Sequence, residues 1–292
     1  METHLNNVTA AHSAASPQTT IAAPAAPAPR RRLKLHRPLL AHALGFTLLL
    51  PLRSAPLDTA ERQQGFVALA DGRTFAGWKH AGNWEIQDGV FARVRSGSQL
   101  VYEGRTVPDN FDLRFEWKVS KGCNSGVYYR PGQVEYQVLD DEFSPYAENP
   151  RQAAASLFFC MAPRKRATRP LGEWNTARIV CQGTVIEHWL NEEKVLSFDY
   201  TDPRWASEVE LLHVRGGDLT GRGGHFILQG HGQDVWFRHL RLREIPAAEK
   251  ITPDPTFRPL PVPPAALAKE EARVRDILAK SAKKNPPPNP AK

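Results

Sequence analysis

A cation, a carboxylate and an amide stand close together in the sequence, at Arg130, Glu135 and Gln137. They lie in two short runs of β-strand composition, residues 127–130 and 134–139, which a Pro-Gly turn joins into a predicted hairpin. Alternate residues of a strand share a face, so Glu135 should project with Gln137, and Arg130 with the tyrosine two residues before it. We expect the cation, the carboxylate and the amide to converge within one hairpin.

Such a set could carry acid–base chemistry on a small molecule. Glu135 can serve as a general base near neutral pH if burial raises its pKa. Arg130 is a fixed cation that can stabilise an oxyanion or bind hydroxyl groups. His231 is a second candidate base because its ordinary pKa is close to neutral, and Gln229 shares its face by strand parity. The predicted catalytic residues are therefore Glu135, His231 and Arg130, although an isolated histidine is more often a surface residue.

Other polar and aromatic residues are suited to contacts with hydroxyl groups. The predicted substrate-binding residues are Asn124, Ser125, Gln137, Asp140, Trp174, Asn175 and Gln229. Each has a structural alternative: the Asn-Ser-Gly sequence that begins at Asn124 is also typical of a turn, and Trp174 could stack on a ligand or pack in the fold.

A metal site is the weaker interpretation of the acidic residues 140–142. Their oxygens could hold calcium, but the segment lacks a loop with ligand spacing, and a solvated strand end is the commoner outcome. We predict no metal and no other cofactor, with a divalent cation such as calcium as the alternative.

Residues 65–246 read as one strand after another. The run 111–119 alternates apolar and charged residues, so Phe111, Leu113, Phe115 and Trp117 should face a core. Further predicted strands are 84–86, 90–92, 156–161, 176–181, 185–190, 195–200, 225–229 and 236–242. No helical period of useful length separates them. The pattern predicts an all-β protein, a sandwich or a barrel.

The first 63 residues are expected to form an export region. Residues 9–29 have the composition of a disordered segment, a basic cluster follows at 30–34, and an apolar run spans 39–52. This order is typical of a secretory signal, and the apolar run is short for a membrane span. We predict a periplasmic or extracellular protein. The alternative is an uncleaved segment that anchors the chain or contacts the membrane transiently.

The charge distribution argues against nucleic-acid binding. The net charge is +7, but residues 1–63 carry 7 basic and 3 acidic residues, and residues 247–292 carry 9 and 5. The 22 basic and 23 acidic residues left between them nearly cancel, so no basic domain face is expected. The tail 247–292 is rich in proline and lysine, with one possible short helix over 265–281.

Three cysteines, Cys123, Cys160 and Cys181, leave two alternatives open. An exported protein could form one disulfide and keep a free thiol, or all three could be small buried side chains. No CxxC spacing is present, so a structural zinc site is not expected.

A series of short sequences in residues 65–246 resembles the 3-keto-disaccharide hydrolase family in order and spacing. They include FAGW at 75–78, WEIQDG at 84–89, NSG at 124–126, EYQVLD at 135–140, GEWNT at 172–176 and LQGHG at 228–232. Members have a concanavalin A-like antiparallel jelly-roll sandwich, so the resemblance implies this fold for residues 64–246. It also implies an exported enzyme that acts on glycosides whose C3 hydroxyl has been oxidised to a ketone.

The family's substrate suggests how such a site would work. A C3 ketone acidifies the hydrogen on C2, so a base that removes it can expel the C1 substituent, and water addition completes a net hydrolysis. The implied reaction is cleavage of a 3-keto-glycoside or 3-keto-disaccharide by elimination and hydration, or by direct hydrolysis. The alternative is a non-catalytic carbohydrate-binding module, because the jelly roll hosts both.

The chain departs from the family's pattern at three places. His239 stands where asparagine is usual, Glu192 stands where glycine is usual, and residues 141–169 lack the family's compact loop. We expect Glu192 to lengthen or reshape its turn. The three departures bear on substrate choice and on activity, and not on the fold.

Overall fold

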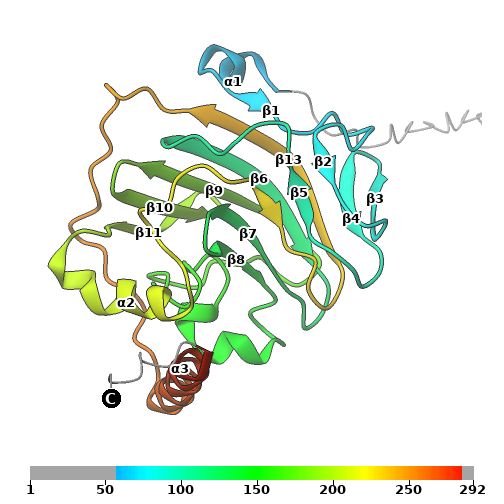
Figure 1. The fold of residues 1–292 in the computed structure, drawn as a ribbon. Coiled ribbons are helices and arrows are strands. Elements are labelled where there is room, and N and C mark those ends of the chain that lie inside the picture. The colour runs from blue at the N-terminus through cyan, green and yellow to red at the C-terminus, as the bar shows by residue number, and fades with distance from the viewer. Residues whose placement is uncertain (1–56, 285–292) are drawn as a thin grey trace, which may run out of the picture. The chain divides into compact units, whose positions relative to one another are not determined.

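The computed structural model describes residues 57–284, which form two antiparallel β-sheets packed face to face (Figure 1). The larger sheet has the order β11-β10-β9-β6-β13-β4-β3, with β1 paired to β13, and the smaller has the order β2-β5-β12-β7-β8. This arrangement confirms the predicted sandwich. The predicted export signal lies outside the described residues.

The strand bounds follow. The larger sheet contains β1 (Val67–Ala68), β3 (Trp84–Gln87), β4 (Val90–Arg93), β6 (Phe111–Val119), β9 (Asn175–Gln182), β10 (Val185–Leu190), β11 (Glu193–Asp199) and β13 (Val235–Glu244). The smaller sheet contains β2 (Trp78–Lys79), β5 (Leu100–Tyr102), β7 (Asn124–Arg130), β8 (Val134–Leu139) and β12 (Ile227–Leu228).

The core between the sheets follows the predicted alternation. The four apolar residues predicted to face inward, Phe111, Leu113, Phe115 and Trp117, are all buried. Phe115 of β6 meets Tyr136 of β8 edge to face, with ring centroids 5.5 Å apart. Burying side chains of this size contributes about 1.5–3 kcal/mol each, so the inner faces supply most of the sandwich's cohesion.

The predicted strand over 156–161 is wrong. Only two isolated bridges occur there, from Leu157 to Tyr136 and to Met161. Ala155 and Phe159 have positive φ angles of 61°, and this left-handed conformation interrupts an extended chain. The segment instead folds back against the edge of β8.

Three α-helices lie in the described residues: α1 (Thr59–Gln63), α2 (Ala206–Val214) and α3 (Pro264–Lys284). Three short 3₁₀ helices are η1 (Pro145–Glu148), η2 (Pro150–Gln152) and η3 (Pro203–Trp205). The sequence did not predict α2, which is short and presents no apolar stripe. The predicted helix over 265–281 lies within α3. None of the helices in residues 57–284 is both long and apolar enough to cross a membrane.

α1 belongs structurally to the sandwich, although its residues fall in the predicted export region. A capping box at Asp58 and Glu61 begins this helix, and Glu61 Oε1 pairs with Arg241 Nε of β13 at 2.9 Å. The helix therefore holds β1 and β13 together at one end of the larger sheet.

The turn between β10 and β11 keeps a two-residue length, so the expectation that Glu192 reshapes it is wrong. Asn191 and Glu192 have φ angles of 50° and 69°, the pattern of a type I′ turn. Glu192 adopts the left-handed conformation that glycine would adopt without strain. His239, at the other departure, also has a positive φ, of 54°.

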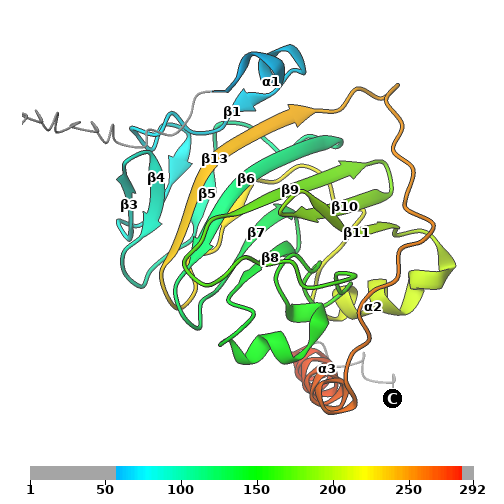
Figure 2. The same ribbon diagram turned by 180° about the vertical axis from the view of Figure 1, so that it is seen from behind.

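The C-terminal segment connects the end of β13 to α3. It passes the edge of the larger sheet (Figure 2), where Asp254 N donates to Ser197 Oγ at 2.9 Å and Leu260 N donates to Pro163 O at 2.9 Å. The three cysteines are buried and free, so no disulfide forms.

Candidate functional site

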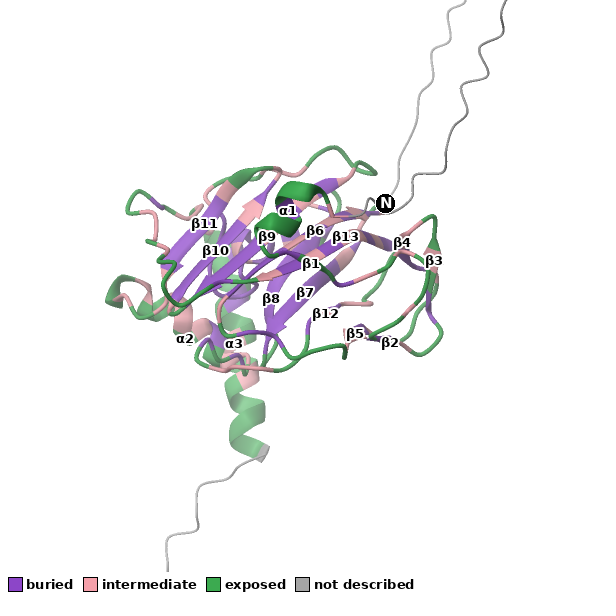
Figure 3. Ribbon diagram, turned by 90° about the horizontal axis from the view of Figure 1, so that it is seen from above, coloured by how far each residue is buried: buried purple, intermediate pink, exposed green. Residues whose placement is uncertain are grey.

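The hairpin of β7 and β8 is buried on both faces (Figure 3). Val127 pairs with Tyr136, and both face the core between the sheets. The neighbouring pair, Tyr128 and Glu135, therefore projects from the opposite, outer face of the smaller sheet. Arg215, which follows α2, closes over this outer face.

Glu135 is the central carboxyl group of the outer face. Only 2% of its side chain is exposed, and its Oε2 accepts a hydrogen bond from Arg215 Nη2 at 2.9 Å. Burial raises the pKa of Glu135 to about 7, because desolvation outweighs the opposing effect of the Arg215 charge. The carboxyl group can therefore exchange a proton near neutral pH.

Gly126 makes room for this carboxyl group. A Cβ atom added at residue 126 would lie 2.1 Å from Glu135 Oε1 and 2.8 Å from the carboxyl carbon. Any side chain there would displace the carboxyl group, so the glycine serves a close approach rather than only a turn.

Tyr128 is a hydrogen-bond donor beside Glu135. Gln229 Nε2 donates to Tyr128 Oη at 2.7 Å, which leaves the phenol hydrogen for another acceptor. Burial, and next the negative charge of Glu135, raise the pKa of Tyr128 to about 12. The phenol therefore stays protonated at neutral pH.

The predicted residues Asn124, Gln137 and His231 come together next to this pair. Gln137 Nε2 donates to Asn124 Oδ1 at 3.0 Å and to the carbonyl of Gln152 at 3.2 Å. Asn124 Nδ2 lies 3.4 Å from Nδ1 of His231, an exposed residue. The side chains of Gln137, Asn124 and His231 thus form a row, here called the polar line, from the buried part of the outer face to solvent.

Two amide oxygens on this face are buried and have no hydrogen-bond partner within residues 57–284. They are Gln137 Oε1 and Gln229 Oε1. Leaving one such acceptor unpaired costs about 1–3 kcal/mol, and binding sites are places where a ligand supplies the missing hydrogen. A molecule with several hydroxyl groups could satisfy both.

Arg130 does not join Glu135, so this part of the expected convergence is wrong. A register shift between Tyr128 and Arg130 breaks the two-residue alternation. The Arg130 guanidinium lies 5.8 Å from the ring centroid of Phe111, at the edge of the core. Arg215, from a distant part of the sequence, supplies the cation instead.

Ser125 and Asp140, both predicted to contact the substrate, bond to the backbone instead. Ser125 Oγ donates to the carbonyl of Gln229 at 2.8 Å and so holds β12 against β7. Asp140 accepts hydrogen bonds from the backbone N–H groups of Gly122, Glu142 and Phe143. Its oxygens thus stabilise a turn. Among residues 57–284, no group of three or more His, Cys, Asp or Glu could hold a metal ion.

Asn175 begins β9 of the larger sheet and Trp174 directly precedes that strand, so neither joins the Glu135 face. The Trp174 ring packs against cations, with the Arg238 guanidinium 4.0 Å from its centroid. Asn175 Oδ1 accepts from Arg169 N and from Asn191 Nδ2, each at 2.8 Å. Both side chains therefore have structural partners.

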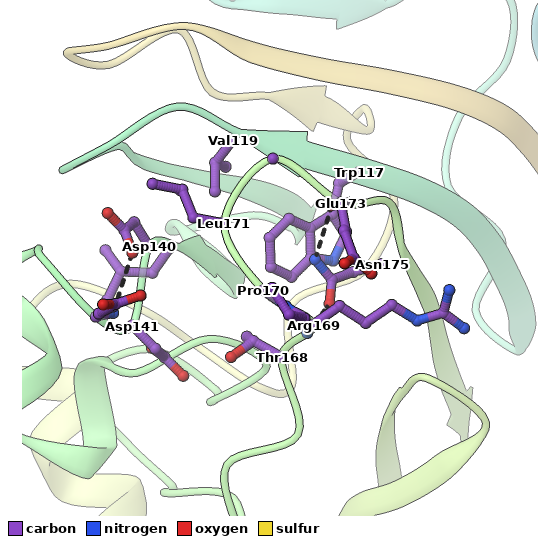
Figure 4. Close-up of a pocket in the computed structure, with 13 residues that line it drawn as sticks. Trp117, Val119, Asp140, Asp141, Thr168, Arg169, Pro170, Leu171, Glu173 and Asn175 are labelled. Atoms are coloured by element: carbon purple, nitrogen blue, oxygen red, sulfur yellow. Dashed lines mark hydrogen bonds between the residues drawn. The ribbon is translucent and has the colours of Figure 1, made fainter. Parts of the chain in front are cut away.

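A separate pocket of about 340 Å³ is lined by the predicted residues Asp140 and Asn175. Trp117, Asp141 and Arg169 also line it. Figure 4 shows the Trp117 ring between Asp141 on one side and Arg169 on the other. Asp141 Oδ1 accepts from Ala154 N at 2.9 Å, and burial raises the pKa of this carboxyl group. The pocket contains no member of the Glu135 cluster.

The sequence interpretation missed Arg215 as a partner of Glu135. A local signal exists: Arg215 precedes a segment with five glycines, at 216, 217, 221, 223 and 224. This segment closely approaches the turn of the β7–β8 hairpin, where a Cβ on Gly132 would lie 2.7 Å from Gly216 O. A cluster of glycines indicates that the backbone approaches another segment closely, but the sequence does not show which strand that segment is.

The two antiparallel sheets packed face to face place the chain among β-sandwich proteins of the concanavalin A-like jelly-roll kind. More specifically, residues 65–243 match the profile of the 3-keto-alpha-glucoside-1,2-lyase-like domain family, and the chain belongs to that family.

Known relatives agree with this assignment. A 3-keto-disaccharide hydrolase of Bacteroides thetaiotaomicron is 32% identical over 248 residues, covering 66% of this chain and 83% of that protein. A solved structure of a candidate glycosyl hydrolase from Parabacteroides distasonis is 24% identical with a TM-score of 0.58, covering 65% of this chain and 99% of that one. A second such structure from the same organism is 25% identical with a TM-score of 0.53, covering 62% and 99%.

Proposed function

We propose that the protein is a carbohydrate-active enzyme that cleaves the glycosidic bond of 3-keto-glycosides, with the outer face of the smaller sheet as its active site. Family membership and the hydrolase relative support the class of reaction. The single observation that carries the proposal for the site is Glu135, a buried carboxyl group with a pKa raised to about 7. A base of this pKa is suited to removing a weakly acidic carbon-bound proton at neutral pH.

The residues around Glu135 fit the steps of an elimination. Glu135 takes the proton from C2, and the C–H electron pair becomes the enolate of the C3 ketone. Arg215 is the cation placed to stabilise the enolate oxygen, and the Tyr128 phenol is the donor placed to protonate the leaving oxygen at C1. Loss of the C1 substituent gives an enone, and addition of water at C1 with a proton at C2 gives the free 3-keto sugar.

The unpaired amide oxygens give the site its expected selectivity for a polyol. Gln137 Oε1 and Gln229 Oε1 can each accept a hydrogen from a sugar hydroxyl, which would remove the cost of leaving them unpaired. His231 remains the proposed second base, at the exposed end of the polar line.

A non-catalytic carbohydrate-binding role is the second candidate, and one contact favours it. Glu135 is bonded to Arg215, and an ion pair of this kind can be purely structural. On this alternative the amide oxygens would bind a sugar and no bond would break.

Export to the periplasm or the cell exterior completes the proposal. It rests on the sequence of residues 1–63, with a basic cluster before an apolar run. Recovery of the protein with its intact N-terminus from the cytoplasm only would contradict it.

Incubation of the purified protein with 3-keto-trehalose and with a 3-keto-glucoside tests the proposed reaction. We expect release of 3-keto-glucose, or of its 2-hydroxyglucal-type enone if hydration is slow. The corresponding glucosides without the ketone are the control and should not be cleaved, since their C2 proton is not acidic. Binding of the keto sugars without any product would favour the binding module instead.

A further inference from the structure

A second hollow lies between the 3₁₀ helices η1 and η2 and the start of α3. It has a volume of about 330 Å³, and its lining includes Tyr146, Gln152, Lys269 and Arg273. None of the predicted site residues lines it. Four of its nine lining residues come from α3, which lies beyond residues 65–243, the part that matches the family. The hollow is therefore formed between the family domain and α3.

The walls of this hollow are fixed by a buried ion pair. Only 2% of the Glu270 side chain is exposed, and its oxygens accept from Asn149 Nδ2 and from Arg151 Nη1, each at 2.7 Å. Arg151 Nη2 also bonds to Glu208 of α2 at 3.3 Å. A charge-assisted network of this kind holds α3 at a set distance from η2.

Gln152 lines the hollow with a side-chain amide that is open to it. The residue as a whole is 8% exposed, but its amide nitrogen and oxygen are not enclosed by other atoms of residues 57–284. An amide has two donor hydrogens and a carbonyl acceptor. The hollow therefore presents both a donor and an acceptor to whatever occupies it.

The remaining lining indicates the chemical class of the occupant. The charged residues of the wall balance one another: two are basic (Lys269, Arg273) and two are acidic (Glu148, Glu270). Lys269 and Glu148 form an ion pair at 2.5 Å. Tyr146 adds a partly buried aromatic ring. An aromatic face with an amide in a wall of balanced charge suits a neutral polyhydroxylated molecule better than an anion or a cation.

We propose that this hollow is a second carbohydrate-binding site, specific for a neutral sugar and separate from the Glu135 face. Gln152 links the two, because its backbone carbonyl accepts the hydrogen bond of Gln137 Nε2 while its side chain lines the hollow. The second site holds a sugar whether or not the first one cleaves its substrate.

Calorimetric titration of the full chain with trehalose, maltose and cellobiose at millimolar concentrations tests this proposal. We expect saturable binding of at least one disaccharide. Tyr146→Ala and Gln152→Ala should each weaken it about tenfold, the equivalent of one good hydrogen bond or stacking contact. Gln87→Ala, at an exposed glutamine of β3, is the matched control and should bind as the wild type does, with melting temperatures confirming that all variants fold.

Glu135→Gln separates the two sites. It should lower turnover by a factor of about 10²–10⁴ while leaving the binding that depends on Tyr146 unchanged. The proposal is overturned if none of the three sugars binds, if Tyr146→Ala and Gln152→Ala bind as tightly as the wild type, or if Glu135→Gln removes the same binding. The last result would place the sugar at the Glu135 face alone.

Discussion

Two buried ionisable groups, His188 and Glu135, lie against opposite faces of the smaller sheet. They differ in whether the polar groups around them have hydrogen-bond partners. His188 comes from β10 into the core, where Nδ1 bonds to Ala155 O and Nε2 to Tyr129 Oη, each at 3.0 Å. Glu135 lies on the outer face beside amide oxygens that have no partner. Both ring nitrogens of the histidine are satisfied, whereas the surroundings of the glutamate are not.

This difference separates a structural polar group from a functional one. A fully hydrogen-bonded buried group fixes one arrangement, here the larger sheet against β7 and the segment that folds over β8. A buried group among unpaired acceptors retains capacity for a ligand. Satisfaction of hydrogen bonds, rather than burial or residue type alone, thus distinguishes the surroundings of His188 from those of Glu135.

The largest stability effect should come from the inner face. Phe115→Ala should lower the free energy of unfolding by about 3–5 kcal/mol, because it leaves a cavity between the sheets. Chemical denaturation measures it, and Phe143→Ala, at an exposed phenylalanine, is the control. A loss below 1 kcal/mol at Phe115 would show that the core can collapse onto the gap.

The two ionisable groups should give pH dependences of opposite sign. Burial lowers the pKa of His188 from 6.5 to about 4, so its folded state resists protonation. Its contribution to stability is complete above pH 6.5 and falls as pH drops toward 4, by roughly 3 kcal/mol. Glu135, whose pKa is raised from 4.5 to about 7, contributes fully below pH 4.5, and this contribution is lost as pH rises through 7.

Glutamine substitutions test both signs. His188→Gln should flatten the loss of stability between pH 6.5 and 4, and Glu135→Gln should flatten the loss between pH 4.5 and 7. Denaturant midpoints across the pH range measure each curve. Parallel curves for the wild type and both variants would contradict the account.

The contrast between Arg215 and Arg130 should appear in the pH dependence of activity. Arg215→Gln removes a positive charge that lowers the pKa of Glu135, so activity should rise with pH at a higher pH than in the wild type. If Arg215 stabilises the ionised carboxylate by roughly 1.4 kcal/mol, the pH profile should move by about one pH unit. Arg130→Gln should leave the pH profile in place, because Arg130 packs against Phe111. A profile that moves for Arg130 and not for Arg215 would restore the assignment made from the sequence.

The smallest effect concerns the turn after β10. Glu192→Gly should raise the free energy of unfolding by about 1 kcal/mol, because glycine adopts the observed φ of 69° without steric cost. Thermal melting measures this, with Glu193→Gly at the start of β11 as the control, which should destabilise. Destabilisation by Glu192→Gly would mean that the glutamate side chain makes a contact that outweighs its backbone strain.

The sequence predicts the sandwich well because strand alternation is a local signal. The alternation over 111–119 predicts β6, and the strand predicted over 185–190 is β10. The hairpin with Glu135 and Gln137 on one face was also predicted correctly.

What the sequence could not provide depends on irregularity and on distance. A bulge between Tyr128 and Arg130 turns the Arg130 side chain away from Glu135. Counting alternate residues along a strand cannot predict such an inserted residue. Arg215 reaches Glu135 from 80 positions away, through a glycine-rich segment with no periodic pattern. Trp174 and Asn175 have suitable side chains, but the fold gives them other partners.

The most direct test of the Glu135 site compares the wild type with Glu135→Gln on one 3-keto-glucoside at the same pH. Glutamine keeps the size of the side chain and removes the base, so turnover should fall by a factor of about 10²–10⁴ while the melting temperature stays the same or rises. Full activity in Glu135→Gln, with the protein folded, would contradict the central claim that the outer face of the smaller sheet is catalytic.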